Sequence, residues 1–214
     1  MSQQKSTLYR YAELLASCTR ARLVGTRGTD DIFTLQVMDC VPSVEFLPAS
    51  GEVVDVGSGG GLPGIVWAVY RPDLNITLID SISKKCEAVN EIINALELQN
   101  VKIICARSEE FAKTHREYFS FAGAKALASA GVCAELLSPL VKVGGKIITF
   151  KGEKVYDEIA EVNHRWKRVG LGEPELHFYG GDNSSKCIVS WEKISPCPKN
   201  YPKHPGNAKK FWEA

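Results

Sequence analysis

A short glycine-rich segment contains the residue types that most clearly suit ligand chemistry. Residues 52–64 read EVVDVGSGGGLPG, so an apolar run passes through Asp55 into a loop with glycines at 57, 59, 60 and 61. Glycine has no Cβ, and such a loop can therefore turn tightly and let a ligand lie against backbone amides. We expect a nucleotide-like cofactor at this loop.

The residues around the loop bear on the identity of that cofactor. Residues 59–64 satisfy the G-x-G-x-x-G pattern of dinucleotide-binding proteins, and a plain strand-to-helix turn is the structural alternative. Asp55 stands just before the first glycine, where its carboxylate could organise the loop backbone or reach a cationic ligand group through water. A carboxylate there would repel a pyrophosphate and attract the ammonium and sulfonium of S-adenosyl-L-methionine. The sequence therefore favours S-adenosyl-L-methionine over NAD.

A second acid ends the next apolar run. Residues 75–80 read NITLID, and Asp80 follows the glycines at the spacing where folds of this kind hydrogen-bond ribose hydroxyls. Asp80 could instead cap the helix that follows, a role that Ser81 and Ser83 could share. Both cofactor hypotheses predict the acid, so it supports a nucleotide site without naming the ligand.

Several motifs together resemble one known family. The string DVGSGGGLPGI at 55–65, followed by RPDL at 71–74 and LIDS at 78–81, resembles the RsmG (GidB) family of bacterial small-subunit rRNA guanine-N7 methyltransferases. The similarity continues through SKK at 83–85, ARSEE at 106–110, AKA at 124–126, KG at 151–152 and YPKHPG at 201–206. Upstream, RLVGTR at 22–27 and LQVMDC at 35–40 lack the Asn, Arg and His of the family pattern. These departures concern the RNA target and leave the cofactor assignment intact.

The resemblance implies roles for residues at the ends of predicted strands. Backbone atoms of Gly57 and Leu62 are expected at the methionine portion of the cofactor and Asp80 at its ribose. The full expected cofactor-binding set is Gly57, Gly59, Leu62, Asp80, Ser81, Ser108, Glu109 and Lys125, with Ser108 and Glu109 beside the adenine. Glu109 could instead be an acid that the helix dipole favours in a first turn. Lys125 stands where the family has arginine. Lysine keeps the positive charge of arginine but lacks its planar guanidinium fork.

Lysines are the candidate RNA contacts, although the formal net charge of the chain is only +1. Non-specific affinity for RNA comes mainly from Lys and Arg that neutralise phosphates. Residues 199–210 contain four lysines and no acid, together with Tyr201. This tail could lie along rRNA or pack its aromatic residues on the domain. Lys151 could contact phosphate or be a solvated strand end, and we expect Lys151, Lys199 and Lys203 to contact RNA.

Strand and helix patterns alternate along most of the chain, which predicts an α/β fold with a parallel sheet. Strands are expected at 53–57, 76–80, 101–106, 119–124 and 146–151, and helices at 8–16, 31–46, 64–70, 84–96, 131–140 and 155–169. Residues 175–179 and 186–191 predict an antiparallel hairpin. The resemblance implies a class I, Rossmann-like methyltransferase with a seven-stranded, mostly parallel sheet. We expect an N-terminal helical extension at 1–46, a methyltransferase domain at 47–195 and a basic tail at 196–214.

The expected activity is S-adenosyl-L-methionine-dependent methylation of a guanine N7 in 16S rRNA. The N7 lone pair is free at neutral pH, so an in-line displacement needs no general base, and no residue is assigned as catalytic. The seven cysteines include no C-x-x-C pair and the four histidines are scattered, so no metal site is expected. The chain shows neither an apolar run long enough for a membrane span nor a signal peptide.

Those features predict a cytoplasmic protein, which we expect to be a monomer. The family resemblance implies that it acts on 16S rRNA or the small ribosomal subunit. Two alternatives stay open at this point. One is a methyltransferase of the same fold with another RNA or a small molecule as acceptor, and the other is a non-catalytic RNA-binding descendant. An NAD-dependent oxidoreductase is disfavoured by Asp55.

Overall fold

A computed structural model describes residues 2–182 and 184–203 of the chain. The chain forms two compact units, Met1–Arg107 and Ser108–Ala214, which we describe separately. The last part of the predicted basic tail, with Lys209 and Lys210, lies outside the described residues. No described helix is long and apolar enough to cross a membrane.

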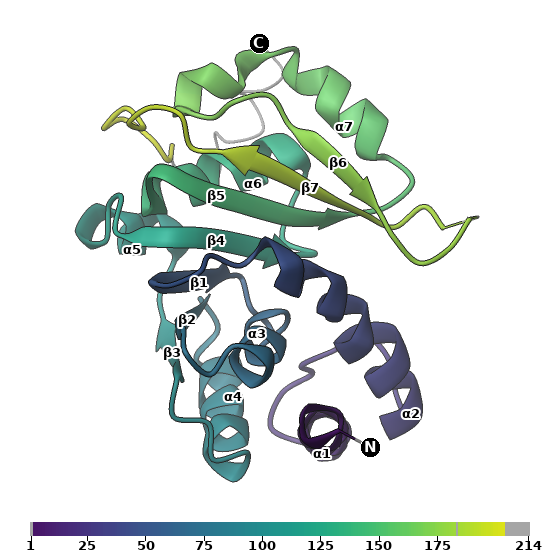
Figure 1. Ribbon diagram of the computed structural model, residues 1–214. Coiled ribbons are helices and arrows are strands. Elements are labelled where there is room, and N and C mark those ends of the chain that lie inside the picture. The colour runs from purple at the N-terminus through teal and green to yellow at the C-terminus, as the bar shows by residue number, and fades with distance from the viewer. Residues whose placement is uncertain (1, 183, 204–214) are drawn as a thin grey trace. The chain divides into compact units, whose positions relative to one another are not determined.

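The first unit is built on three parallel strands in the order β3-β2-β1 (Figure 1). Their bounds are Glu52–Val56 for β1, Asn75–Asp80 for β2 and Val101–Cys105 for β3. Helices α3, Gly64–Tyr70, and α4, Ser83–Ala95, follow β1 and β2. Residues 53–56 and 76–80 are buried throughout, as expected for strands covered on both faces.

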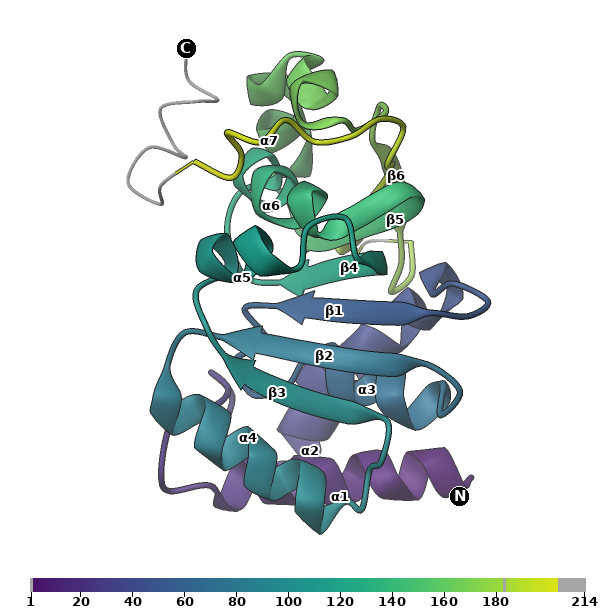
Figure 2. The ribbon, with the colours of Figure 1, turned by 90° about the vertical axis from the view of Figure 1, so that its left-hand side faces the viewer.

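An N-terminal helical segment covers part of this unit. Helix α1, Gln3–Ser17, begins at Ser2, whose hydroxyl accepts a hydrogen bond from Lys5 N. It buries Leu8, Tyr11, Ala12 and Leu15, which form one helical face, and it contacts both α3 and α4 (Figure 2). A continuous helical stretch follows, made of α2, Thr29–Ile32, a π-helical segment, Phe33–Val37, and a 3₁₀ segment, Met38–Phe46. Both predicted N-terminal helices are therefore confirmed.

The second unit combines parallel and antiparallel strands in the order β4-β5-β7-β6. Strands β4, Phe119–Lys125, and β5, Val141–Lys151, are parallel. Strand β7, Cys187–Glu192, runs antiparallel to β5 and to β6, Glu175–Phe178, which confirms the predicted hairpin. The helices are α5, Ser108–Thr114, α6, Ala130–Leu137, and α7, Val155–Val162, with 3₁₀ segments at Ser138–Leu140 and Arg165–Val169.

The structure differs from the predicted elements in several places. Helix α5 was not predicted, although Glu109 and Glu110 lie in its first turn, as the helix dipole favours. The helix predicted at 155–169 is interrupted, because Asn163 and His164 adopt positive φ values of 47° and 58° that an α-helix cannot contain. Strand β5 begins at Val141, five residues before the predicted start at 146, where Gly144 and Gly145 had weakened the strand pattern.

The seven strands agree with the predicted mostly parallel α/β fold of class I methyltransferases. Strands β1 to β5 alternate with helices along the chain, as predicted. In the C-terminal pair, β7 is the strand that runs antiparallel to its neighbours. The domain boundaries predicted after residues 46 and 195 do not coincide with the two compact units and stay a prediction.

Candidate cofactor site

The glycine loop is held against the end of strand β2. Gly57 N and Ser58 N both donate hydrogen bonds to Ile79 O, at 2.8 and 3.0 Å. Gly57, Gly59 and Gly61 have φ values of 71°, 56° and 97°, which confirms the predicted need for glycine. Between residues 53 and 68, Gly57 and Gly59 alone are not buried. The loop therefore exposes backbone where two neighbouring strands end, the edge at which ligands of open α/β sheets bind.

Asp55 organises the backbone of the loop, which is one of the two roles considered for it. Its side chain is fully buried, and Oδ2 accepts a hydrogen bond of 2.9 Å from Gly64 N at the start of α3. A Cβ at Gly64 would lie 2.1 Å from Leu78 Cδ2, so only glycine lets the start of α3 approach β2 this closely. The carboxylate thus joins the end of β1 to the helix that follows the loop.

Asp80 connects the loop to the next helix. Its Oδ2 accepts a hydrogen bond from Gly59 N and its Oδ1 accepts one from Ile82 N, both at 2.9 Å. An ionised carboxylate has about four lone-pair sites, so two bonds to the backbone leave acceptor capacity for ribose hydroxyls. The capping role considered for Asp80 is wrong, because the N-cap of α4 is Ile82 and no side chain caps that helix. The ribose role of Asp80 stays a prediction.

The N-terminal segment supports the loop from the other side, a contribution that the sequence did not predict. Tyr11 is fully buried, and its hydroxyl donates a hydrogen bond of 2.7 Å to Gly60 O. Burial raises the pKa of Tyr11 well above its usual value, so the hydroxyl stays protonated and able to donate. A Cβ at Gly60 would lie 3.1 Å from Leu15 Cδ2 and 3.2 Å from Leu23 Cβ. Only the regular spacing of apolar residues along α1 hinted that this face is buried.

The residues of the first unit fit S-adenosyl-L-methionine. Gly57, Gly59, Leu62 and Asp80 lie together around the loop, and an added Cβ at Gly59 would meet no atom closer than 3.8 Å. There is room at Gly59 for a ligand to approach the backbone. Asp80 adds a carboxylate at the same place, and Ser81 follows it with an exposed side chain.

The other predicted cofactor residues belong to the second unit. Ser108 and Glu109 open helix α5, and Ser108 Oγ donates a hydrogen bond of 3.2 Å to Glu109 Oε2. Glu109 thus has the first-turn position considered as its structural alternative. Lys125 ends strand β4, with its Nζ 5.9 Å from the centre of the Phe150 ring, within reach of a cation–π contact.

Lys151 is not the solvated strand end considered as one of its alternatives. Only 6% of its side chain is exposed, and Nζ lies 2.8 Å from Glu158 Oε2. Nζ also donates to Ala128 O, while the same Glu158 oxygen accepts from Ala130 N at the start of α6. The ammonium is committed to an ion pair that joins β5, α6 and α7. The predicted contact of Lys151 with RNA phosphate is not tested by this arrangement.

The described part of the tail packs on the second unit. The guanidinium of Arg116 donates hydrogen bonds to the carbonyls of Cys197, Pro198 and Tyr201 at 2.6 to 2.8 Å. Tyr201 is 8% exposed, so its aromatic ring packs on the domain, which was one of the two alternatives. Lys203 N donates to Glu135 Oε1, and its Nζ lies 5.6 Å from the centre of the Tyr201 ring. Lys199 is exposed, and the roles of both lysines toward RNA stay predictions.

The cysteines are mostly buried, as predicted for small apolar side chains. Cys40, Cys86, Cys133, Cys187 and Cys197 are buried, and Cys105 is exposed at the end of β3. Within residues 2–182 and 184–203, no group of three or more His, Cys, Asp or Glu side chains is placed to hold a metal ion.

Comparison with known proteins identifies the family. Residues 4–185 match the family model described as rRNA small subunit methyltransferase G (GidB). The ribosomal RNA small subunit methyltransferase G of Petrotoga mobilis is 43% identical over 165 residues, which cover 76% of this chain and 73% of that protein. The protein of the same name from Clostridium perfringens strain 13 is 33% identical over 216 residues, which cover 97% and 89%.

Solved structures support the fold. An rRNA methylase from Streptococcus thermophilus has a TM-score of 0.54 at 17% identity, covering 74% of this chain and 95% of that one. A putative S-adenosyl-L-methionine-dependent methyltransferase from Methanococcus maripaludis has a TM-score of 0.57 at 15% identity, covering 78% and 90%. At such identities the likeness concerns the fold alone. The family match over most of the chain and the close relatives show that this chain belongs to the rRNA small subunit methyltransferase G (GidB) family.

Proposed function

We propose that this protein transfers a methyl group from S-adenosyl-L-methionine to the N7 atom of a guanine in 16S rRNA. The observation that carries the proposal is the glycine loop, which Asp80 and Tyr11 hold from two sides while Gly57 and Gly59 keep partly exposed backbone. In a chain of this family, that arrangement is suited to the cofactor of a methyltransferase.

The roles of the residues follow from their positions. When bound, S-adenosyl-L-methionine supplies the electrophilic methyl group. Gly57, Gly59 and Leu62 would hold its methionine portion, and the Asp80 carboxylate would accept the ribose hydroxyls beside Ser81. Ser108, Glu109 and Lys125 complete the proposed cofactor set. Because N7 of guanine carries a free lone pair at neutral pH, the protein contributes binding and orientation rather than a general base.

Three further properties belong to the same proposal. The protein acts as a monomer, which sedimentation at micromolar concentration would test. It needs no metal ion, so methyl transfer should persist in excess EDTA. It works in the cytoplasm, where its proposed substrate, the small ribosomal subunit, is found.

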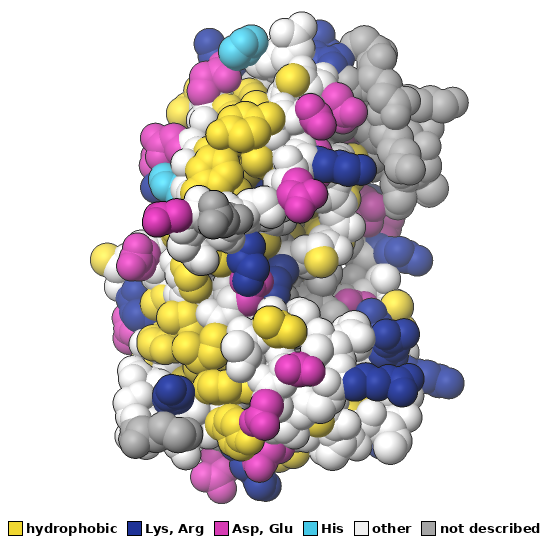
Figure 3. Space-filling view, turned by 90° about the vertical axis from the view of Figure 1, so that its right-hand side faces the viewer, with side chains coloured by type: hydrophobic (Ala, Val, Ile, Leu, Met, Phe, Trp, Pro, Cys, Tyr) yellow, Lys and Arg dark blue, Asp and Glu magenta, His cyan; other side chains and the backbone are white. Residues whose placement is uncertain are grey.

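A second candidate is a methyltransferase of the same fold with a different acceptor. The segments at 22–27 and 35–40, which lack the Asn, Arg and His of the family pattern, favour it. On the face shown in Figure 3, Lys and Arg side chains lie interspersed with Asp and Glu rather than in one broad basic area, in keeping with the net charge of +1. An enzyme for RNA with such a surface must concentrate its cations locally.

Labelled methyl transfer to small ribosomal subunits that lack N7-methylguanosine tests the proposal directly. We expect label on a single guanine N7, located by primer extension after cleavage at the modified base. Label on another RNA or a small molecule, with subunits unmodified, would support the second candidate. Cofactor binding by calorimetry without any transfer would point to a non-catalytic RNA-binding protein.

Two glycine substitutions separate cofactor contact from backbone strain. Gly59→Ala and Gly144→Ala both place a side chain at positive φ, 56° and 83°, and neither Cβ meets an atom closer than 3.8 Å. Each should cost about 1–2 kcal/mol of stability. Gly59→Ala should in addition weaken S-adenosyl-L-methionine binding by at least tenfold, whereas Gly144→Ala should leave it unchanged. Equal affinities in the two variants would remove Gly59 from the cofactor site.

A further inference from the structure

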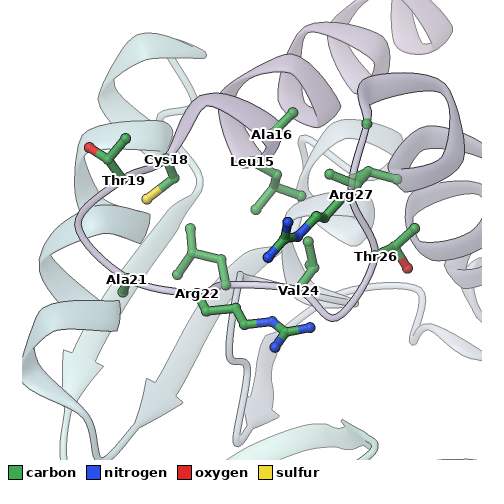
Figure 4. Close-up of a pocket in the computed structure, with 12 residues that line it drawn as sticks. Leu15, Ala16, Cys18, Thr19, Ala21, Arg22, Val24, Thr26 and Arg27 are labelled. Carbon is green, nitrogen blue, oxygen red and sulfur yellow. The ribbon is translucent and has the colours of Figure 1, made fainter.

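A cavity of 420 Å³ lies between the end of helix α1 and the segment that follows it, residues 18–28. Leu15, Leu23 and Ile32 are its buried apolar lining, and Thr26 adds a hydroxyl. Figure 4 shows the segment curving around the cavity, with the guanidinium of Arg27 inside the curve near Val24 and Leu15. The cavity thus joins an apolar surface to a cation, at a size typical of small-ligand sites.

The charge of the cavity is positive and uncompensated by its own lining. Two of the lining residues, Arg22 and Arg27, are arginines, and none is an acid. Arg22 donates one hydrogen bond of 3.0 Å to Gly25 O, and Arg27 makes no hydrogen bond or ion pair with any described residue. Arg20, which is not in the lining, is by contrast paired with Glu87 and Glu91. Arg27 therefore presents a complete guanidinium fork to a ligand.

A second cavity shows that this charge is not general to the unit. It measures 650 Å³ and lies between the start of α1 and residues 96–100. Its lining includes Gln3, Gln4, Gln99 and Asn100, with Glu97 as its one charged residue. A guanidinium is suited to a phosphate or carboxylate, so an anionic ligand is expected in the first cavity and not in the second.

The arginine-lined cavity also adjoins the proposed cofactor loop. Leu15 and Leu23, which line it, are the residues that would stand 3.1 and 3.2 Å from a Cβ at Gly60. One layer of side chains therefore separates the cavity from the glycine loop. A polymer bound in the cavity would pass close to the place where the proposed methyl donor is held.

We propose that this cavity binds one nucleotide of the acceptor RNA strand, with Arg27 and Arg22 on its phosphates and its sugar and base against Leu15, Leu23 and Val24. The proposal rests on the proposed function, since it names the part of the protein that grips the RNA. Guanidinium groups match phosphate in charge and geometry, and the apolar lining suits the flat faces of a nucleobase. The cofactor itself, with a sulfonium, an ammonium and one carboxylate, has a net positive charge, which two guanidinium groups without acidic partners would repel.

Charge-removing variants provide the test. Arg27→Gln removes a guanidinium that makes no described hydrogen bond or ion pair, so loss of folding is not expected from it, and R22Q/R27Q removes both cations. The matched control K5Q/R10Q also removes two positive charges, but from exposed side chains of α1 that lie outside the cavity. The probes are a fluorescently labelled single-stranded RNA fragment of 16S sequence, GMP, and S-adenosyl-L-methionine. Thermal unfolding of each variant confirms that it is folded.

We expect R22Q/R27Q to weaken binding of the RNA fragment by at least tenfold. Arg27→Gln alone should weaken it by about threefold, which is half of that effect in free energy. The slope of log K against log salt should decrease by about 0.7 for each phosphate of a single strand that the variant no longer neutralises. S-adenosyl-L-methionine affinity should stay within twofold of the wild type in every variant. K5Q/R10Q should change RNA affinity by less than threefold.

Three results would overturn the assignment. The first is that R22Q/R27Q and K5Q/R10Q have equal RNA affinity and equal salt slope. The second is that R22Q/R27Q has the wild-type KM for small subunits in the methyl-transfer assay. The third is that the protein binds GMP tightly but does not bind the RNA fragment. The second result leaves the proposed function standing, because methyl transfer itself is then intact. If the wild type neither binds RNA nor transfers methyl to any RNA, the proposed function fails as well.

Discussion

The hydrogen bond from Tyr11 to Gly60 allows a quantitative test of how the N-terminal segment supports the cofactor loop. Tyr11→Phe removes only the hydroxyl and leaves the buried ring in place. The change deletes a bond of 2.7 Å between the fully buried Tyr11 and the buried Gly60, and it leaves Gly60 O without that donor. A hydrogen bond of this kind contributes about 1 kcal/mol, and a buried carbonyl left unsatisfied costs about 1–3 kcal/mol. We therefore expect a loss of about 2 kcal/mol, or about 4–8 °C in Tm for a chain of this length.

The effect should extend to cofactor binding. Gly60 stands between Gly59 and Gly61, so a loop released from Tyr11 samples conformations that do not bind the ligand. If the competent conformation falls to about one tenth of the population, the apparent Kd for S-adenosyl-L-methionine rises about tenfold. Isothermal titration calorimetry measures that Kd, and differential scanning calorimetry measures the change in stability.

Tyr9→Phe is the matched control, because it removes the same atom from the same helix. Tyr9 Oη lies 2.8 Å from Asp30 Oδ1 at an exposed position, where water can take the place of the hydroxyl. We expect a stability change within about 0.5 kcal/mol and no change in cofactor affinity. Equal effects of Tyr9→Phe and Tyr11→Phe on both quantities would refute the argument that α1 holds the loop.

Two more predictions concern the charges and thiols of the two units. Lys151→Met should destabilise the protein by about 2–4 kcal/mol, because it leaves the Glu158 carboxylate without its buried partner. Lys113→Met should cost less than about 0.5 kcal/mol, since the ion pair of Lys113 with Glu110 is exposed. Chemical denaturation of both variants measures this difference. Burial and the thiol of Cys105 raise the pKa of Cys86 to about 12, so iodoacetamide at pH 8.5 should modify Cys105 and spare Cys86. An unfolded cysteine ionises at about pH 8.5, well below the pKa of folded Cys86. A rise in pH from about 9 toward 12 therefore ionises the thiol of the unfolded chain preferentially, and this should lower the stability of the folded protein.

Local patterns in the sequence were enough for the elements that position the cofactor loop. The alternation of apolar runs with helical segments located β1, β2, α3 and α4 to within one or two residues. Glycines at 57, 59 and 61 marked the positions with positive φ, since no other residue adopts that conformation so readily. These features depend on neighbours along the chain, and for that reason they could be predicted from a single sequence.

The contacts that fix the loop are between residues distant in the chain, and those could not be predicted from local pattern. Tyr11 and Gly60 are 49 residues apart, and nothing in the spacing of α1 indicates which backbone carbonyl its hydroxyl would meet. Lys151 shows the same limit, because its position at a strand end left phosphate contact and solvent as the alternatives, while tertiary packing gave it an acidic partner, Glu158, on α7. A charged residue at the end of a strand is informative about function only when its tertiary partners are known.

The same reasoning separates Arg27 from the other cations near the N-terminus. In the sequence, Arg20, Arg22 and Arg27 form one basic cluster, and charge alone ranks them equally. In the structure, Arg20 is bound by two glutamates, Arg22 is tied to its own loop, and Arg27 extends into a cavity without an acid. An arginine engaged by carboxylates must lose those partners before it can take a phosphate, whereas Arg27 has no such bond to break. For a protein with a net charge of +1, RNA affinity depends on how many cations are left without a carboxylate partner, and Arg27 in the cavity beside the glycine loop is one of them.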